Sequence, residues 1–290
     1  MLSRREAGRL LLSAGVTAAL PAVARAADPG NRVVCVSKQI NEFIYDIGAQ
    51  SHLVARDLTS IYPPQIKQLT SVGYHRALSA EGIISMRPSV LLTDGNVGPD
   101  PVLAQVRSVG IPIETMEPGE TPEAAQALML KLGVYFHREA AARAVVAKWQ
   151  ADMAQALADM RRYAGKPKPR VLMIHFGQIN NSYLGLSRGG PADAVIAWAG
   201  GINAIDQIGG MARLTPEMIA RAAPDIIIAT DVGYDRYGSP EKFRSLPGVE
   251  LTPAGKSLNI HRIDETEIIY FGPRTPQTLH KVVGWLHGAH

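Results

Sequence analysis

The residue types best suited to binding chemistry lie in one short segment, Val72-Gly-Tyr-His-Arg-Ala-Leu-Ser-Ala-Glu-Gly82. Tyr74 and Arg76 stand two positions apart, directly after Gly73, which favours a tight turn. Ser79 is suited to cap a helix that begins at the next residue. The pattern therefore predicts that Tyr74 and Arg76 lie on a loop just before a helix, where a rigid scaffold often holds binding residues.

A phenol beside a guanidinium is suited to binding ferric iron. Iron(III) prefers an anionic oxygen, whereas a free phenol titrates at about pH 10. A cation about 4 Å away, at an effective dielectric constant of about 20, favours the phenolate by roughly 4 kcal/mol. Tyrosinate is also an axial ligand of ferric haem in some proteins. The alternative is a half-buried loop tyrosine whose ring carries the arginine in a cation–π contact.

The first 26 residues are predicted to be a cleavable signal peptide, so we expect a periplasmic protein. A basic start precedes the apolar run Leu10–Leu20, which is too short to span a bilayer. Ala24-Arg-Ala26 then offers small residues for cleavage. Ser3-Arg-Arg5 resembles a twin-arginine signal, and both Sec and twin-arginine export remain open.

Charge and composition argue against a nucleic-acid partner. The formal net charge is +4, and removing the predicted signal peptide lowers it to +1, because that segment carries four basic residues and one acidic residue. The remaining chain of about 264 residues is long enough for two modest domains. The single cysteine, Cys35, lies in an apolar run and is expected to be buried in a strand.

Strand and helix patterns alternate along the rest of the chain, which is typical of an α/β fold with a parallel or mixed sheet. In the first half, strands are expected over 32–36, 53–56, 90–93 and 113–116, and helices over 40–48, 79–86 and 101–110. In the second half, strands are expected over 170–174, 183–186, 225–229 and 259–263, and helices over 191–199, from 215 onward and over 278–286.

A long helix is predicted between the two halves. Arg138–Tyr163 contains neither Gly nor Pro, and its apolar residues recur every three or four positions. A continuous helix of this length would measure about 39 Å and would hold two lobes at a nearly fixed angle. We therefore predict an N-terminal lobe over 27–120, a linking helical segment over 121–166 and a C-terminal lobe over 167–290.

The two lobes share an internal repeat. Leu78–Thr93 aligns without a gap onto Leu214–Ala229, at an offset of 136 residues, with four identical positions that include Glu81 and Glu217. Each copy predicts a capped helix that ends before a proline and leads into an apolar strand. We interpret the repeat as two lobes of one fold, although any unit of this kind would look similar.

These motifs resemble the family of periplasmic haem-binding proteins that serve haem ABC importers. The segment Val72–Gly82 is similar to the family's signature, and the likeness covers nearly all of the chain after the predicted signal peptide. Further agreement lies in Tyr62-Pro63 with Leu69, in Thr252–Gly255 and in Phe271–Pro276, whose prolines we interpret as fixing the entry to the last helix. The resemblance implies two Rossmann-like lobes joined by a long rigid helix, the class III periplasmic binding protein fold, with ligand in the cleft between them.

The resemblance also assigns residues. It implies that Tyr74 is the axial ligand of ferric haem b and that Arg76 supports it by hydrogen bonding. His75 departs from the residues expected between these two, which leaves open whether it adds a contact. Glu81 and Glu217 are expected to dock onto the permease, because related carriers dock through one glutamate in each lobe; the alternative is that each carboxylate only matches a helix dipole.

Three further residues are candidates for ligand contact. His175 follows the first strand of the second lobe, where some family members use a histidine to hold a second haem. Tyr234 and Arg236 lie on a predicted loop, and the Arg236 guanidinium would match a haem propionate. The alternatives are a hydrogen-bonded histidine at a strand end and a solvated loop.

The favoured function is therefore a monomeric carrier, without enzymatic activity, that delivers haem to an inner-membrane ABC permease dimer with its ATPase, downstream of an outer-membrane haem receptor system. One alternative is the same scaffold carrying a ferric siderophore or cobalamin. Another is an exported hydrolase, which is disfavoured because the sequence contains no His-x-x-x-His or paired metal-ligand spacing.

Overall fold

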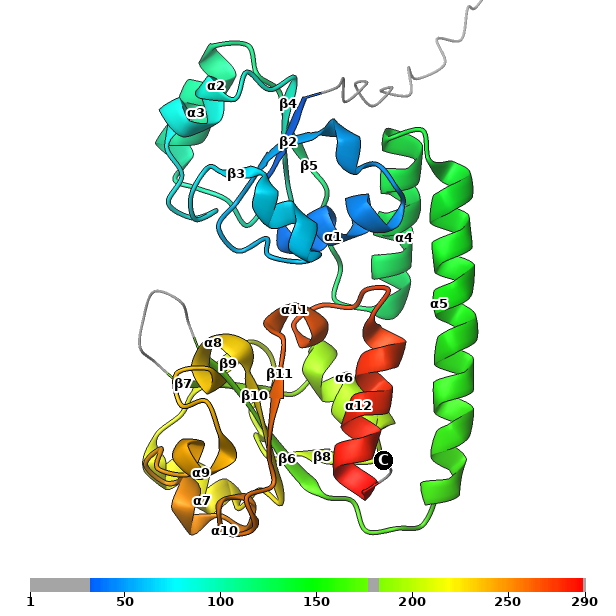
Figure 1. The fold of residues 1–290 in the computed structure, drawn as a ribbon, viewed down its shortest axis with the longest axis vertical. Coiled ribbons are helices and arrows are strands. Elements are labelled where there is room, and N and C mark those ends of the chain that lie inside the picture. Colours follow the sequence, from blue (N-terminus) through cyan, green and yellow to red (C-terminus); the bar gives the residue numbers. More distant parts are fainter. Residues whose placement is uncertain (1–31, 177–182, 289–290) are drawn as a thin grey trace, which may run out of the picture.

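The computed structural model describes residues 32–176 and 183–288, so the predicted signal peptide lies outside the described residues. Figure 1 shows two α/β lobes on one side of a pair of long helices. The predicted two-lobed α/β fold is thus confirmed. Within the described ranges, no helix is both long and apolar enough to span a membrane.

The N-terminal lobe is built on a five-stranded sheet in which all pairings are parallel, in the order β3-β2-β1-β4-β5. The central strands β1 and β4 are buried along their whole length, as their continuous apolar sequences indicate. The strands are β1 (Val33–Cys35), β2 (Leu53–Arg56), β3 (Thr70–Ser71), β4 (Val90–Thr93) and β5 (Ile113–Thr115). The helices are α1 (Lys38–Asp46), α2 (Ala80–Ser85) and α3 (Asp100–Ser108), with short 3-10 helices at Gln50–His52 and Pro64–Gln68.

The C-terminal lobe has a six-stranded mixed sheet in the order β11-β10-β6-β7-β9, with β8 paired to β6. Its core is parallel, whereas β7 runs antiparallel to both of its neighbours. The strands are β6 (Arg170–Phe176), β7 (Tyr183–Leu186), β8 (Ile202–Asn203), β9 (Met211–Arg213), β10 (Ile226–Thr230) and β11 (Ile260–Ile263). The helices are α6 (Pro191–Trp198), α7 (Pro216–Ala222), α8 (Asp231–Tyr234), α9 (Pro240–Phe243), α10 (Pro253–Ser257), α11 (Glu265–Ile268) and α12 (Thr275–His287), with a 3-10 helix at Val249–Leu251.

Two helices connect the lobes, where the sequence indicated one. The predicted long helix is α5 (Glu139–Asp159), which continues into a 3-10 helix at Met160–Tyr163. It is preceded by α4 (Pro122–Tyr135), which begins at the cap residue Thr121 and packs along α5 (Figure 1). Because α5 also packs against α12, the connector contacts both lobes.

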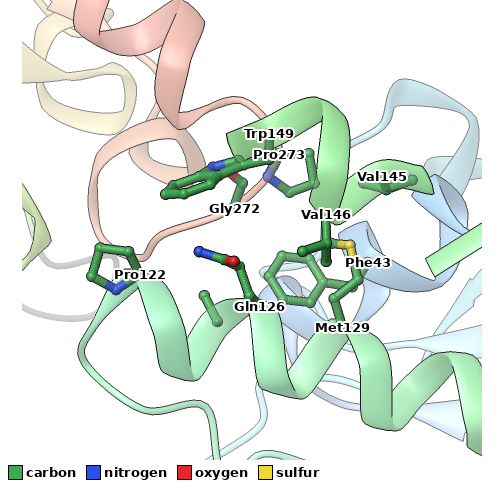
Figure 2. Close-up of a pocket in the computed structure, with 10 residues that line it drawn as sticks. Phe43, Pro122, Gln126, Met129, Val145, Val146, Trp149, Gly272 and Pro273 are labelled. Carbon is green, nitrogen blue, oxygen red and sulfur yellow. The ribbon is translucent and has the colours of Figure 1, made fainter. Parts of the chain in front are cut away.

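Figure 2 shows the junction where α4 and α5 meet the loop that leads into α12. The Trp149 indole N–H donates to the Gly272 carbonyl at 2.8 Å, and Phe43 of α1 packs beside them. The space left between these groups is about 10 Å³, roughly one water molecule. The junction is therefore closely packed, and the space in it is too small to be a ligand site.

A buried ion pair joins the lobes. Glu42 of α1 is 1% exposed, and its carboxylate accepts hydrogen bonds from Arg274 at 2.7 and 2.8 Å. The Tyr270 hydroxyl donates to the same carboxylate at 2.6 Å, and the Arg274 guanidinium lies 3.6 Å from the Tyr62 ring centre. Burial, together with the Glu42 charge, raises the pKa of Tyr270 well above its usual value, which keeps this hydroxyl a donor.

Apolar packing crosses the same boundary. Phe271 of the C-terminal segment is 3% exposed and belongs to the core that includes Phe43 and Leu132 of the N-terminal half. The Trp198 ring of α6 lies 5.7 Å from the Phe271 ring. The two lobes therefore share a core as well as an ion pair, and their relative placement is fixed by both.

Replacing Glu42 with Gln is expected to lower the free energy of unfolding by about 3 kcal/mol, because the largely buried Arg274 loses its closest counter-charge and keeps only the longer pair with Glu267, at 3.7 Å. Urea denaturation measures this. The control is Lys148→Ala, which breaks an exposed pair with Asp152 and is expected to cost less than about 1 kcal/mol. Equal losses in the two variants would contradict the role given to the buried pair.

His261 of β11 is expected to make the free energy of unfolding depend on pH. Its ring stacks on Trp285 at 4.7 Å, and burial lowers its pKa to about 4. An unfolded histidine titrates at about 6.5, so between about pH 6.5 and 4 the unfolded chain binds more protons. Stability should therefore fall as pH decreases through this window. His261→Phe should flatten the dependence in pH-resolved urea denaturation, and an unchanged slope would rule out this histidine as its source.

Candidate functional site

A cleft of about 710 Å³ lies between the lobes, a volume within the usual range of ligand pockets. Most of its lining comes from segments that follow the carboxyl ends of parallel strands, where ligands of α/β proteins usually bind. The N-terminal lobe contributes Val36, Ser37, Lys38, Thr59, Tyr74, His75, Arg76, Ala77, Asp94 and Asn96. The C-terminal lobe contributes His175, Leu184, Met211, Arg213, Glu265 and Ile269.

The loop that carries Tyr74 is held on both sides by backbone hydrogen bonds. Gly73 has φ +103°, a conformation that side chains rarely adopt, and its carbonyl accepts from the Leu58 N–H at 2.7 Å. The Tyr74 carbonyl accepts from the Ala77 N–H at 2.7 Å, and α2 begins at Ala80. The predicted loop before a capped helix is therefore confirmed, and it presents Tyr74 to the cleft.

Arg76 and His75 are linked through one amide. The Arg76 Nε donates to the Asn96 Oδ1 at 2.7 Å, and the Asn96 Nδ2 lies 3.3 Å from the His75 Nε2. The His75 ring lies beside that of Tyr74, with ring centres 4.4 Å apart. His75, whose contact was left open by its sequence position, thus lines the cleft together with Tyr74 and Arg76.

A buried carboxylate lies behind His75. Asp57 directly follows β2, its side chain is 0% exposed, and its Oδ2 is 3.3 Å from the His75 Nδ1. Thr59 and Ser60 donate hydrogen bonds to the same carboxylate. Burial alone would raise the pKa of Asp57, but the hydrogen bonds from His75, Ser60 and Thr59 outweigh it, so the pKa lies below its usual value. Asp57 is therefore a charged group inside the N-terminal lobe.

On the opposite wall, His175 is 8% exposed and lines the cleft from β6. Its Nδ1 lies 3.3 Å from the Thr230 hydroxyl. Burial lowers the pKa of His175, which favours the neutral imidazole. Nearby, Lys38 of the N-terminal lobe forms an ion pair with Glu265 of the C-terminal lobe, so charge pairing also bridges the lobes inside the cleft.

Tyr234 and Arg236 do not line this cleft. The segment predicted as a loop begins with α8, and the Tyr234 ring packs on Phe243 in the core of the C-terminal lobe, with ring centres 5.7 Å apart. Their contact with a ligand stays a prediction from sequence.

Several cleft residues were not singled out from the sequence, although a signal existed for some. Lys38 and Glu265 each come within a few residues of the end of a predicted strand, where cleft residues of α/β folds gather. Arg213 alternates with the buried Ala212 on β9, a pattern that indicates an outward-facing side chain. Asn96 follows β4 in a turn whose backbone N–H is bonded to Asp94.

The glutamates of the repeat occupy equivalent places. Glu81 lies in the first turn of α2 and Glu217 in the first turn of α7, and both are exposed. The predicted caps are confirmed, since Ser79 and Thr215 each accept a hydrogen bond from a backbone N–H three residues on. The Thr215 side chain and the Glu217 backbone N–H lower the pKa of the Glu217 carboxyl. In Figure 1, α2 and α7 lie on the side of the molecule opposite α5, one in each lobe.

Two features bear on other chemistries. Gly185-Leu-Ser-Arg-Gly189 has the Gly-x-Ser-x-Gly spacing of a hydrolase nucleophile elbow. Ser187, however, is 3% exposed, and its Oγ has no hydrogen-bond partner among the described residues, so no histidine activates it there. Throughout residues 32–176 and 183–288, no group of three or more His, Cys, Asp or Glu is placed to hold a metal ion.

The fold is similar to those of several haem-binding proteins. The periplasmic heme-binding protein RhuT from Roseiflexus sp. RS-1, in apo form, shares 31% identity and a TM-score of 0.78, over 89% of this chain and 98% of that chain. BhuT, a periplasmic heme-binding protein in complex with two hemes, shares 29% identity and a TM-score of 0.77, over 88% and 97%. HutB of Vibrio cholerae, also a periplasmic heme-binding protein, shares 25% identity and a TM-score of 0.74, over 88% and 98%.

By sequence, the chain is also similar to vitamin B12-binding proteins. A vitamin B12-binding protein from Photorhabdus laumondii is 27% identical over 146 residues, which cover 50% of this chain and 51% of that protein. The chain thus matches about half the length of this curated relative. Residues 33–267 match the family described as periplasmic binding proteins. Since that match covers most of both lobes, the chain belongs to the periplasmic binding protein family.

Proposed function

We propose that this protein captures ferric haem in the cleft between its lobes and delivers it to an inner-membrane ABC permease. The observation that carries the proposal is Tyr74, held on a fixed loop in a cleft of about 710 Å³ with Arg76 two residues away. A phenolate oxygen suits ferric iron, and a guanidinium stabilises that oxygen electrostatically. The similar haem-binding structures support the same conclusion.

Other cleft residues suit the rest of a haem molecule. Arg213 is exposed, and its guanidinium forms no hydrogen bond or ion pair with the described residues, so it is available for a carboxylate such as a propionate. Leu184 and Met211 offer apolar surface for the macrocycle on the same wall. In this arrangement Tyr74 holds the iron from one lobe, and the other lobe contacts the macrocycle and its edge.

The rest of the proposal concerns export and partners. Residues 1–26 direct export to the periplasm and are then removed. The mature protein acts as a monomer without enzymatic activity, receives haem released by an outer-membrane system and binds a permease dimer with its ATPase. Membership of a family of binding proteins supports this reading over an exported hydrolase.

Cobalamin is the second candidate ligand, because vitamin B12-binding proteins are among the relatives by sequence. The two ligands differ in their metal, since haem presents a ferric iron that the Tyr74 oxygen can bind, whereas cobalamin carries cobalt. Parallel titrations with haemin and with cyanocobalamin separate them. Haem binding predicts a tyrosinate-type visible spectrum with haemin and no saturable response to cyanocobalamin.

Tyr74→Phe is expected to abolish the high-spin tyrosinate spectrum of the haemin complex and to weaken haemin binding strongly. Arg76→Ala should weaken binding less, by roughly tenfold, because it removes electrostatic support but leaves the iron ligand. Absorbance titrations of the purified variants measure both effects. If Tyr74→Phe binds haemin with the wild-type spectrum, Tyr74 is not the ligand.

His175 is proposed to ligate the iron of a second haem. It lines the cleft, and its lowered pKa favours the neutral imidazole that binds metals. The wild type should bind two haems per chain and His175→Ala one, by native mass spectrometry and absorbance. One haem per chain in the wild type would rule out this role and leave His175 as a structural partner of Thr230.

Glu81 and Glu217 are proposed to dock the protein onto permease arginines, one in each lobe. Both are exposed at equivalent helix starts, and rim charges of this kind govern orientation and encounter more than affinity. Replacing both with Lys should leave haemin binding and folding unchanged but stop haem uptake in vesicles that contain the permease. A matched control is Glu123→Lys with Glu139→Lys, which alters first-turn glutamates of the connector helices. Normal uptake by the Glu81/Glu217 variant would exclude the docking role.

A further inference from the structure

The groups behind Tyr74 form one continuous hydrogen-bonded chain. It runs from the Asp57 carboxylate through the His75 ring to the Asn96 amide and ends at the Arg76 guanidinium. The separations are 3.3 Å from the Asp57 Oδ2 to the His75 Nδ1, 3.3 Å from the His75 Nε2 to the Asn96 Nδ2, and 2.7 Å from the Arg76 Nε to the Asn96 Oδ1. Its inner end is fully buried and its outer end is exposed.

The direction of each hydrogen bond follows from the two charged ends. The guanidinium only donates, so the Asn96 carbonyl faces Arg76 and the Asn96 NH₂ faces His75. Because the Asn96 NH₂ donates toward the His75 Nε2, the Nε2 must be the ring nitrogen that carries the lone pair. The ring proton is then on the Nδ1, where it faces the Asp57 carboxylate. Every donor in the chain therefore meets an acceptor.

We propose that Asp57 is a positioning residue for the haem site, and that it fixes the Arg76 guanidinium beside Tyr74 through His75 and Asn96. Arg76 itself is exposed, and a long exposed side chain would otherwise sample many rotamers. Asp57 is anchored on its other side by Ser60, which in turn accepts from Asn41, so the chain starts from a rigid point. The inference rests on the proposed function, in which Arg76 supports the iron ligand.

The first test needs no haem. Two-bond ¹H–¹⁵N correlation spectra of the ligand-free protein report which ring nitrogen of His75 is protonated. The Nδ1–H tautomer is expected in the wild type. Protonation of the Nε2 would place two donors face to face and overturn the chain, whatever the protein binds.

The second test reads the iron–phenolate bond in the haemin complex by resonance Raman and visible absorption. Asn96→Ala and Asp57→Asn should shift the iron–phenolate stretch in the same direction as Arg76→Ala and weaken haemin binding by roughly tenfold. The matched control is Ser108→Ala, which removes an exposed side-chain hydrogen bond to the Gln105 carbonyl on α3 of the same lobe and touches no group of the chain. It should leave the spectrum unchanged.

If Asp57→Asn does not fold, the role of the chain is tested instead by comparing His75→Gln with His75→Leu. A glutamine amide carries one donor and one acceptor, so His75→Gln can join Asp57 to Asn96, whereas His75→Leu cannot. His75→Gln should retain the wild-type spectrum and His75→Leu should reproduce that of Asn96→Ala. If Arg76→Ala shifts the spectrum while Asn96→Ala and His75→Leu match the wild type, the positioning role is overturned and the assignment of Tyr74 stands.

Discussion

The relative placement of the two lobes depends on one carboxylate that both of them surround. Glu42 belongs to α1, while its partners Arg274 and Tyr270 lie more than 220 residues later. Removing the Glu42 and Arg274 charges from water costs free energy. That cost is offset when two N–H groups of the Arg274 guanidinium and the Tyr270 hydroxyl all donate to the Glu42 carboxylate. The pair therefore favours one arrangement of the lobes, with the shared core around Phe271 packed beside it.

That arrangement places the carboxyl ends of the parallel strands of one sheet opposite those of the other. Short segments after β1, β2, β3 and β4 then face the segment after β11 and residues of β6, β7 and β9 across the cleft. Most of the polar cleft residues lie in segments that follow strands, and His175 of β6 and Arg213 of β9 add polar side chains from the strands themselves. The rigid frame explains how an exposed loop can present Tyr74 in a defined direction. The loop is hydrogen-bonded to Leu58, which follows β2, and to Gly98, which follows β4.

Local patterns in the sequence predicted what depends on local structure. Apolar runs gave β1, β4 and β10, the residue types at Ser79 and Thr215 predicted two helix caps, and the turn before Tyr74 was anticipated at Gly73. Helix α4 lies inside the linking helical segment predicted over 121–166 but was not recognised as a separate helix, because its apolar residues do not form a single stripe: it packs against both α1 and α5.

Contacts between distant segments could not be predicted in the same way. Arg274 lies in a segment interpreted as structural for its prolines, and nothing near it in the sequence points to Glu42. Asp57 and Asn96 belong to no motif in the sequence, and only the folded chain places them next to His75. Tyr234 illustrates the opposite case, because an aromatic residue on a Gly-flanked segment suggested a binding loop, whereas its ring completes the core around Phe243.

The central claim is that the cleft binds ferric haem through the Tyr74 oxygen. A crystal structure of the haemin complex, with anomalous data collected at the iron absorption edge, tests it most directly. The claim predicts an iron peak in the cleft at bonding distance from the Tyr74 Oη, with Arg76 beside it. An iron peak bonded to a different residue, or haem bound outside the cleft, would contradict it.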